Sequence, residues 1–182
     1  MTSSSDTFLL RQATADDIDE IMSIIMQSRE ILRRDDIPQW QDEAGAPTRD
    51  EFLATIAKKQ TYVLVADDSG RIAALANLIP GPDPWYANIE KGQWRYPDVP
   101  YIAIHRVAAS PAFAGRHIGA RLLSALRSEI RTLGYQQARI DTHERNGRMR
   151  HIISNAGFHH AGEIFTRGDR LSPRRAYEIL LK

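Results

Sequence analysis

The stretch YIAIHRVAASPAFAGRHIGARLL, from Tyr101 to Leu123, decides the fold and the first functional hypothesis. Strand-forming residues run to Ala109, Ser110-Pro111 interrupts them, and a loop of small residues leads into a helical apolar pattern at Ile118. A helix begins with unpaired backbone N–H groups and the positive end of its dipole, so such a loop suits phosphate oxygens. The spacing matches neither a Walker loop nor a full G-x-G-x-x-G motif, which indicates another phosphate-bearing ligand.

Length and composition predict one globular domain. The chain has 182 residues, of which 42% are hydrophobic and 26% charged, and no internal repeat divides it. We expect a single domain over residues 1–182, with residues 1–6 flexible. No apolar run is long enough to cross a bilayer, and no secretory leader pattern opens the sequence. Without cysteine, disulfides and thiolate chemistry are excluded, and a cytoplasmic location is expected.

Charge is segregated along the chain although the net charge is only +1. Residues 1–60 hold twelve Asp and Glu against seven Lys and Arg, whereas residues 114–150 hold eight Arg against three acidic residues. The basic segment suits an anionic cofactor and the acidic one a cationic substrate, although solvated helix faces explain both equally well. The basic residues lack interleaved aromatics, so we expect neither a nucleic acid nor a membrane as partner.

Apolar periodicity predicts an α/β chain. Four helices are expected: one from Thr14, one from Thr48, one from Ile118 to Leu133 and one from Asn146. Thr14 and Thr48 are each followed three positions later by an acidic residue, which completes a capping box. Strands are expected at residues 8–11, 62–66, 72–79, 102–109, 138–142, 159–165 and 176–181. Strand-helix-strand alternation between hairpins predicts a mixed sheet covered by helices.

Residues 80–100 carry five prolines and two tryptophans, which argues against regular structure. Long loops in small domains often bind ligands, so aromatic side chains here are expected to wall a substrate pocket. The alternative is that they pin the loop to the core. The expected pocket residues are Trp85, Tyr86, Trp94 and Tyr96, with Trp40 from an earlier polar stretch.

Five motifs together resemble one bacterial subgroup of the GNAT superfamily of acyl-CoA-dependent N-acetyltransferases. They are IPQWQD at 37–42, HRVAASP at 105–111, GRHIGARLL at 115–123, DTHERNGRM at 141–149 and NAGF at 155–158. The resemblance implies a mixed sheet of six to seven strands flanked by about four helices, with strands splayed at the acyl-CoA site. It also implies acetyl-CoA as cosubstrate, a primary amine of a small molecule or peptide as acceptor, and a possible homodimer.

The family loop [QR]-x-x-G-x-[GA] falls on Ala114, His117 and Gly119, and the first two depart from it. His117 must therefore avoid a positive φ or accept strain of about 1 kcal/mol. Backbone N–H groups of the loop are expected to face a pyrophosphate, the preceding strand to pair with the pantetheine arm, and Asn146 to contact that arm or cap a helix. The implied cofactor residues are Val107, Ala108, Ala109, Ala114, Gly115, Arg116, His117, Ile118, Gly119, Ala120 and Asn146.

The implied reaction is direct attack of an amine on the acetyl thioester in a ternary complex. His105 and His143 are the candidate catalytic residues, because histidine exchanges protons near neutral pH. A core histidine is the alternative for His105, and a polar knot with Asp141 and Asn146 is the alternative for His143.

A general acid is missing from its usual place. Many family members have a tyrosine where this chain has Ile153, which leaves water, His151 or Tyr96 to protonate the leaving thiolate. Two other functions stay open: a catalytically silent CoA-binding domain and a nucleotide-binding domain. The spacing of the histidines lacks H-E-x-x-H, so no metal is expected.

Overall fold

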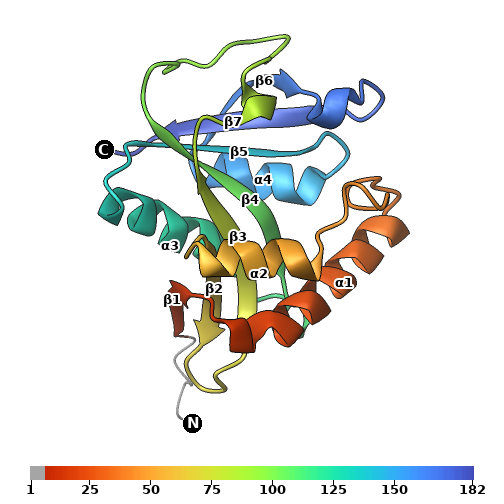
Figure 1. Cartoon of the computed structure of the whole chain (residues 1–182), viewed down its shortest axis with the longest axis vertical. Coiled ribbons are helices and arrows are strands. Elements are labelled where there is room, and N and C mark those ends of the chain that lie inside the picture. The colour runs from red at the N-terminus through yellow and green to blue at the C-terminus, as the bar shows by residue number, and fades with distance from the viewer. Residues whose placement is uncertain (1–6) are drawn as a thin grey trace.

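A computed structural model describes residues 7–182, and the predicted flexible start at residues 1–6 lies outside the described part. Within residues 7–182 the chain forms seven strands and four α-helices (Figure 1). The strands are β1 (Phe8–Gln12), β2 (Thr61–Ala66), β3 (Ile72–Pro80), β4 (Tyr101–Ala109), β5 (Gln137–His143), β6 (His159–Ile164) and β7 (Arg174–Leu180). The helices are α1 (Ile18–Arg34), α2 (Arg49–Ala57), α3 (Ile118–Thr132) and α4 (Gly147–Asn155).

All seven strands form one mixed sheet in the order β1-β2-β3-β4-β5-β7-β6. Only β4 and β5 run parallel, because α3 connects them as a crossover; every other neighbouring pair is antiparallel. The predicted α/β fold, with its six to seven strands and about four helices, is confirmed. The N-terminal capping box is also present, with Thr14 N–H donating to the Asp17 carboxylate at 2.7 Å, although it opens a 3-10 turn before α1.

Alternating side chains of the sheet divide the core into two layers. The even-numbered positions of β2, such as Leu64, pack with α3 and α4 in the larger cluster. The odd-numbered positions, such as Val63, pack against α1 and α2 on the opposite face. In Figure 1, α1 and α2 lie in front of the strands and α3 lies on the far side. Helices therefore cover both faces of the β1–β4 half of the sheet.

Strands β4 and β5 separate half-way along their length. Their pairing runs from Tyr101 opposite Gln137 to Ile104 opposite Ile140 and ends there, although both strands continue. Beyond Ile104, β4 is bonded only to β3. One edge of its backbone is therefore available to a ligand, as the predicted splay requires.

A β-bulge lies where the strands separate. His105 is opposite Asn77 and Ala108 is opposite Leu75, so β4 has one residue more than β3 in this interval. Arg106 absorbs the extra residue with a φ of 56°. Its guanidinium binds both carboxylate oxygens of Glu51 in α2, at 2.8 and 3.1 Å, which offsets the cost of the left-handed backbone.

The loop of residues 80–100 is anchored to the second half of the sheet rather than loose. The Arg139 guanidinium lies between the rings of Trp94 and Tyr101, at 4.1 and 3.9 Å from their centroids. Glu90 exchanges backbone hydrogen bonds with Glu163 of β6. The loop therefore forms the second covering layer on the face that α1 and α2 leave open.

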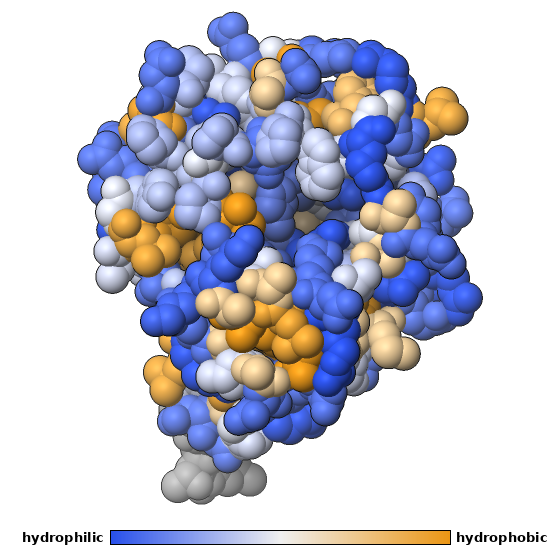
Figure 2. Space-filling view, in the orientation of Figure 1, coloured by the Kyte–Doolittle hydropathy of each residue, from blue (hydrophilic) through white to orange (hydrophobic). Residues whose placement is uncertain are grey.

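The surface is mostly hydrophilic in the view of Figure 2, with an apolar patch over the region of α1 and α2. In the part of the chain that the structure describes, no helix is long and apolar enough to span a membrane.

Gly92 tests the anchoring of this loop. A Cβ there would lie 1.9 Å from the carbonyl oxygen of Ala161 in β6, and backbone cannot move aside as a side chain can. Gly92→Ala should therefore lower the free energy of unfolding by about 1–3 kcal/mol or more, measured by urea denaturation. Gly134→Ala is the control, because its φ of 87° is strained but open space surrounds it, and it should cost only about 1 kcal/mol. Equal losses in the two variants would contradict tight docking.

Candidate active site

One large cleft follows the gap between β4 and β5. Its volume is about 1040 Å³, which exceeds the roughly 300–1,000 Å³ usual for a single small ligand. One half is lined by the end of β4 and the starts of α3 and α4, and the other by α1, the α1–α2 connection and the middle of β4 and β5. The two halves of the cleft therefore meet beside the bulge.

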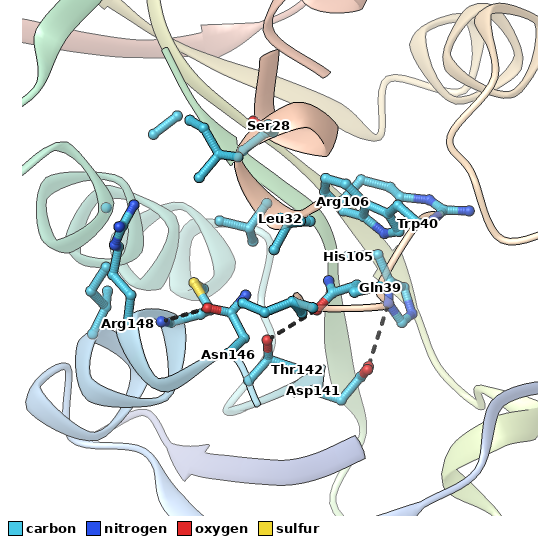
Figure 3. A pocket seen from close by; sticks show the side chains of 18 of the residues that line it. Ser28, Leu32, Gln39, Trp40, His105, Arg106, Asp141, Thr142, Asn146 and Arg148 are labelled. Carbon is cyan, nitrogen blue, oxygen red and sulfur yellow. Dashed lines mark hydrogen bonds and ion pairs between the residues drawn. The ribbon is translucent and has the colours of Figure 1, made fainter. Parts of the chain in front are cut away.

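His105 lies in this cleft next to the bulge, and Figure 3 shows its ring facing Asp141. Asp83 approaches the same ring. The His105 Nε2 is 2.6 Å from the Asp83 carboxylate and its Nδ1 is 3.9 Å from the Asp141 carboxylate. Asp83 comes from the loop of residues 80–100, whereas Asp141 comes from β5. Three segments distant in sequence thus meet at one imidazole.

Further contacts hold both carboxylates in place. Asp141 accepts hydrogen bonds from the Tyr86 hydroxyl at 2.8 Å and from Arg174 at 3.1 Å. Burial and the neighbouring Asp141 charge raise the pKa of Tyr86 well above its ordinary value, so its hydroxyl remains a donor. Burial raises the pKa of Asp83, but the hydrogen bond and charge of His105 outweigh it, and the net shift is downward. The hydrogen bond and charge of His105 therefore favour the carboxylate form of Asp83.

The other half of the cleft is built mainly from backbone. Val107, Ala108 and Ala109 line it along the free edge of β4. Gly115 and His117 follow with φ of 80° and 54°, and α3 begins directly after His117. The first-turn N–H groups of α3 have no acceptor within the helix and border the cleft. Of the two alternatives expected for His117, a negative φ or a strained positive one, the structure has the positive φ.

Arg116 lies differently from the prediction. It is absent from the cleft lining, and its guanidinium stacks over the rings of Phe8 and Phe113, 4.9 and 5.2 Å from their centroids. Its backbone N–H donates to the Phe113 carbonyl at 3.2 Å. The αL turn at His117 directs this side chain toward the outer surface of α3 and β1. The remaining predicted cofactor residues line the cleft, namely Ala114, Gly115, His117, Ile118, Gly119, Ala120 and Asn146 with the three β4 residues.

Asn146 and His143 both organise the turn between β5 and α4. The Asn146 side-chain oxygen accepts from Met149 N–H at 3.1 Å and caps α4, while its side chain borders the cleft (Figure 3). His143 is 2% exposed and does not line the cleft; its Nδ1 accepts from Arg145 N–H at 3.1 Å. Asp141 meets His105 rather than His143, so the two predicted catalytic histidines are not brought together.

The predicted pocket aromatics separate into two groups. Trp40 and Trp85 line the cleft, and Trp85 packs edge-on against the His105 ring with 6.5 Å between centroids. Tyr86 and Trp94 are buried beneath the loop instead, where the Trp94 indole N–H donates to the Tyr86 carbonyl. Tyr96 lies outside the cleft because its segment packs over Arg139, to which its carbonyl is bonded.

The connection from α1 to α2 crosses the cleft and contacts the β5–α4 turn. The Gln39 side-chain oxygen accepts from His143 N–H at 3.2 Å and from the Thr142 hydroxyl at 3.4 Å (Figure 3). Asp36 and Asp35 pair with Arg145 and Arg148 of the same turn. Sequence reasoning missed Gln39 and Asp83, because nothing local marks contacts over such separations; the IPQWQD motif was the only signal near Gln39.

Comparison with known proteins identifies the family. The family model described as Acetyltransferase (GNAT) family matches residues 25–158. The chain belongs to the GNAT acetyltransferase family. It is 27% identical over 119 residues to an uncharacterized N-acetyltransferase, YesJ, of Bacillus subtilis, a match that spans 65% of this chain and 63% of that relative's length. Family membership confirms the resemblance and agrees with the predicted enzyme class.

Solved structures agree with the GNAT assignment. A GNAT-family acetyltransferase from Streptococcus agalactiae superposes with a TM-score of 0.87 at 30% identity, over 96% of each chain. Another from Listeria monocytogenes has a TM-score of 0.75 at 18% identity, over 100% of this chain and 99% of that chain, and shows the shared fold. In residues 7–182 of this GNAT protein, no group of three potential metal ligands is assembled.

The left-handed backbone of His117 should limit which side chains this position tolerates. His117→Gly relieves the αL strain of about 1 kcal/mol and should leave the free energy of unfolding equal or higher, whereas the β-branched His117→Val should lower it by about 1–2 kcal/mol. Urea denaturation measures both. Equal stability of the glycine and valine variants would show that the left-handed turn is absent.

Stability should depend on pH through His143. Burial and then the Arg174 charge lower the pKa of His143, so the unfolded chain takes up this proton more readily than the native protein. The stabilisation is present above about pH 6.5, the ordinary histidine value, and is lost as the pH falls below it. His143→Asn keeps an acceptor for Arg145 N–H and should lose less stability than the wild type between pH 7 and 5. Burial also lowers the pKa of His160, so His160→Asn should reduce the loss of stability in the same direction. Parallel curves for wild type and His143→Asn would contradict this assignment.

Proposed function

We propose that this protein transfers the acetyl group of acetyl-CoA directly to a primary amine, with both molecules bound in the one cleft. The observation that carries the proposal is the continuity of the cleft, which joins the start of α3 to His105 without an intervening wall. Holding two reactants in this way replaces a bimolecular step by an effectively intramolecular one.

The residues present fit acetyl-CoA as the cosubstrate. The first-turn N–H groups of α3 would hold the pyrophosphate. Gly115 would allow it to approach closely, because no atom lies within 4 Å of the place that a Cβ of residue 115 would occupy. The free edge of β4 at residues 107–109 would hold the pantetheine amides as an added strand would. The thioester supplies the activated acetyl group. Because these contacts are mainly backbone, the departures at Ala114 and His117 do not remove them.

His105 is the base in this proposal. The nitrogen of the neutral amine attacks the thioester carbonyl carbon, a C–N bond forms, the C–S bond breaks, and the nitrogen loses one proton to the imidazole. An amine that binds as an ammonium ion first releases its additional proton to solvent. The resulting imidazolium lies between Asp83 and Asp141, which stabilise its charge as the aspartate of a catalytic triad does. The same proton can then pass to the departing thiolate, so protons balance without a further group.

This route removes the need for a tyrosine acid. Ile153 is fully buried against α3, and the two alternative donors, His151 and Tyr96, do not line the cleft. The negative charge on the carbonyl oxygen would be met by backbone N–H groups at the bulge of β4. His143 contributes to the β5–α4 turn and takes no part in the chemistry.

His105→Gln tests the base directly, because glutamine keeps a donor for Asp83 but cannot take up a proton. With a panel of primary amines, thiol release and the mass of the acetylated product should show kcat reduced about 10²–10⁴-fold. The affinity for acetyl-CoA, measured by calorimetry, should be unchanged. His159→Gln, at an exposed position outside the cleft, is the control.

Two results would contradict the proposal. An unchanged kcat in His105→Gln would exclude histidine as the base. Tight binding of acetyl-CoA without thiol release for any amine would favour the silent CoA-binding domain instead.

A further inference from the structure

The charge around His105 leaves room for one cation. Asp83 and Asp141 supply two carboxylates, whereas Arg174 supplies one guanidinium, which is bonded to Asp141 at 3.1 Å. Side chains of Asp141 and Arg174 are only 4% and 15% exposed, so solvent compensates them poorly. One excess negative charge therefore remains, and it matches a single proton carried either by the bound amine or by the imidazole.

The other charged side chains on the acceptor side of the cleft already have partners. Arg106 is bonded through two nitrogens to Glu51, and a further nitrogen donates to the Gly45 carbonyl at 3.0 Å. Arg167 lies 3.5 Å from Asp42. Among the described residues, the cleft lining thus offers neither a second unpaired carboxylate for another ammonium group nor a free guanidinium for a carboxylate on this side.

The remaining walls on this side are largely apolar. Trp85 is 39% exposed in the absence of any ligand and stands edge-on to His105, so an apolar group placed against it would cover it. Leu32 and Ile37 of the α1 region and Ile79 of β3 also line the cleft, and Trp40 closes it from the α1–α2 connection (Figure 3).

We infer that the acceptor is a monoamine: one primary amine carried on a flat or aliphatic body that has no second charge. This inference rests on the proposed function and names its substrate class. Diamines, polyamines and amino acids are disfavoured because their second charge would be desolvated against apolar walls and already paired side chains. The site would thus select a monoamine by penalising substrates with a second charge, not by making an additional attractive contact to the monoamine.

Two matched substrate pairs test the inference with the wild-type protein. L-Phenylalanine differs from 2-phenylethylamine by one carboxylate, and 1,6-diaminohexane differs from hexylamine by one ammonium group. With acetyl-CoA fixed, kcat/KM from thiol release and product mass should fall at least about tenfold on adding either charge. Trp85→Ala should lower kcat/KM for 2-phenylethylamine while leaving KM for acetyl-CoA unchanged.

A gain of function provides the sharper test. Glu51→Gln removes the carboxylate that neutralises Arg106 but retains a side chain of similar shape in the first turn of α2. The freed guanidinium should accept a substrate carboxylate, so the discrimination against L-phenylalanine should shrink at least about threefold, with that against 1,6-diaminohexane unchanged or larger. Thermal unfolding of the variant checks that its fold is retained.

Each outcome has one meaning. Equal or better use of the charged member of either pair would overturn the monoamine inference and leave amine acetylation standing. No acetylated product from these four amines or from any other amine of the panel, despite binding of acetyl-CoA, would overturn the proposed function itself. A preference for 2-phenylethylamine and hexylamine over their charged counterparts, with the effect of Glu51→Gln confined to the pair that differs by a carboxylate, supports both the proposed function and the monoamine inference.

Discussion

The separation of β4 from β5 after Ile104 and Ile140 is the constraint on which the site depends. Parallel pairing to the ends of both strands would close the gap and bury the β4 edge in sheet hydrogen bonds. The bulge at Arg106 coincides with this point and keeps His105 and Ala108 on the same face of the sheet, although they are an odd number of positions, three, apart in sequence. One backbone irregularity therefore sets both the position of His105 and the free edge of β4, the two features on which the proposed function rests.

A second constraint is the loop of residues 80–100, which brings Asp83 to His105. Its anchor is the Arg139 side chain between Trp94 and Tyr101, and its end near the site is held by the Tyr101 hydroxyl, which accepts from Asp83 N–H at 2.8 Å. Tyr101 thus contacts both the anchor and the catalytic end. Tyr101 therefore stabilises the fold of the loop and, through Asp83, also helps to fix the orientation of the His105 ring. These contacts hold a proline-rich segment in one conformation.

The sequence predicted the sheet, the four helices and most of the cofactor half of the cleft, because these follow from local apolar periods, capping residues and one contiguous motif. It did not predict the partners of His105. Asp83 and Asp141 lie 22 and 36 positions away in sequence, and their approach depends on how two strands separate and how a loop packs. The stacking of Arg116 on Phe8 is unpredictable for a related reason, because 108 positions separate the two residues in sequence.

The two sides of the cleft differ in whether backbone or side-chain groups line them. On the cosubstrate side, free N–H groups of α3 and β4 remain available because Gly115 and the small residues before it leave the backbone uncovered. On the proposed acceptor side, charged side chains such as Arg106 are held by internal partners, and among the described residues that line the cleft the excess negative charge lies beside His105. A site of this kind tolerates departures from a binding motif, because it uses few side chains for affinity, but it is sensitive to any change that frees a charge. In the monoamine proposal, selectivity therefore depends on ion pairs that never touch the reacting atoms.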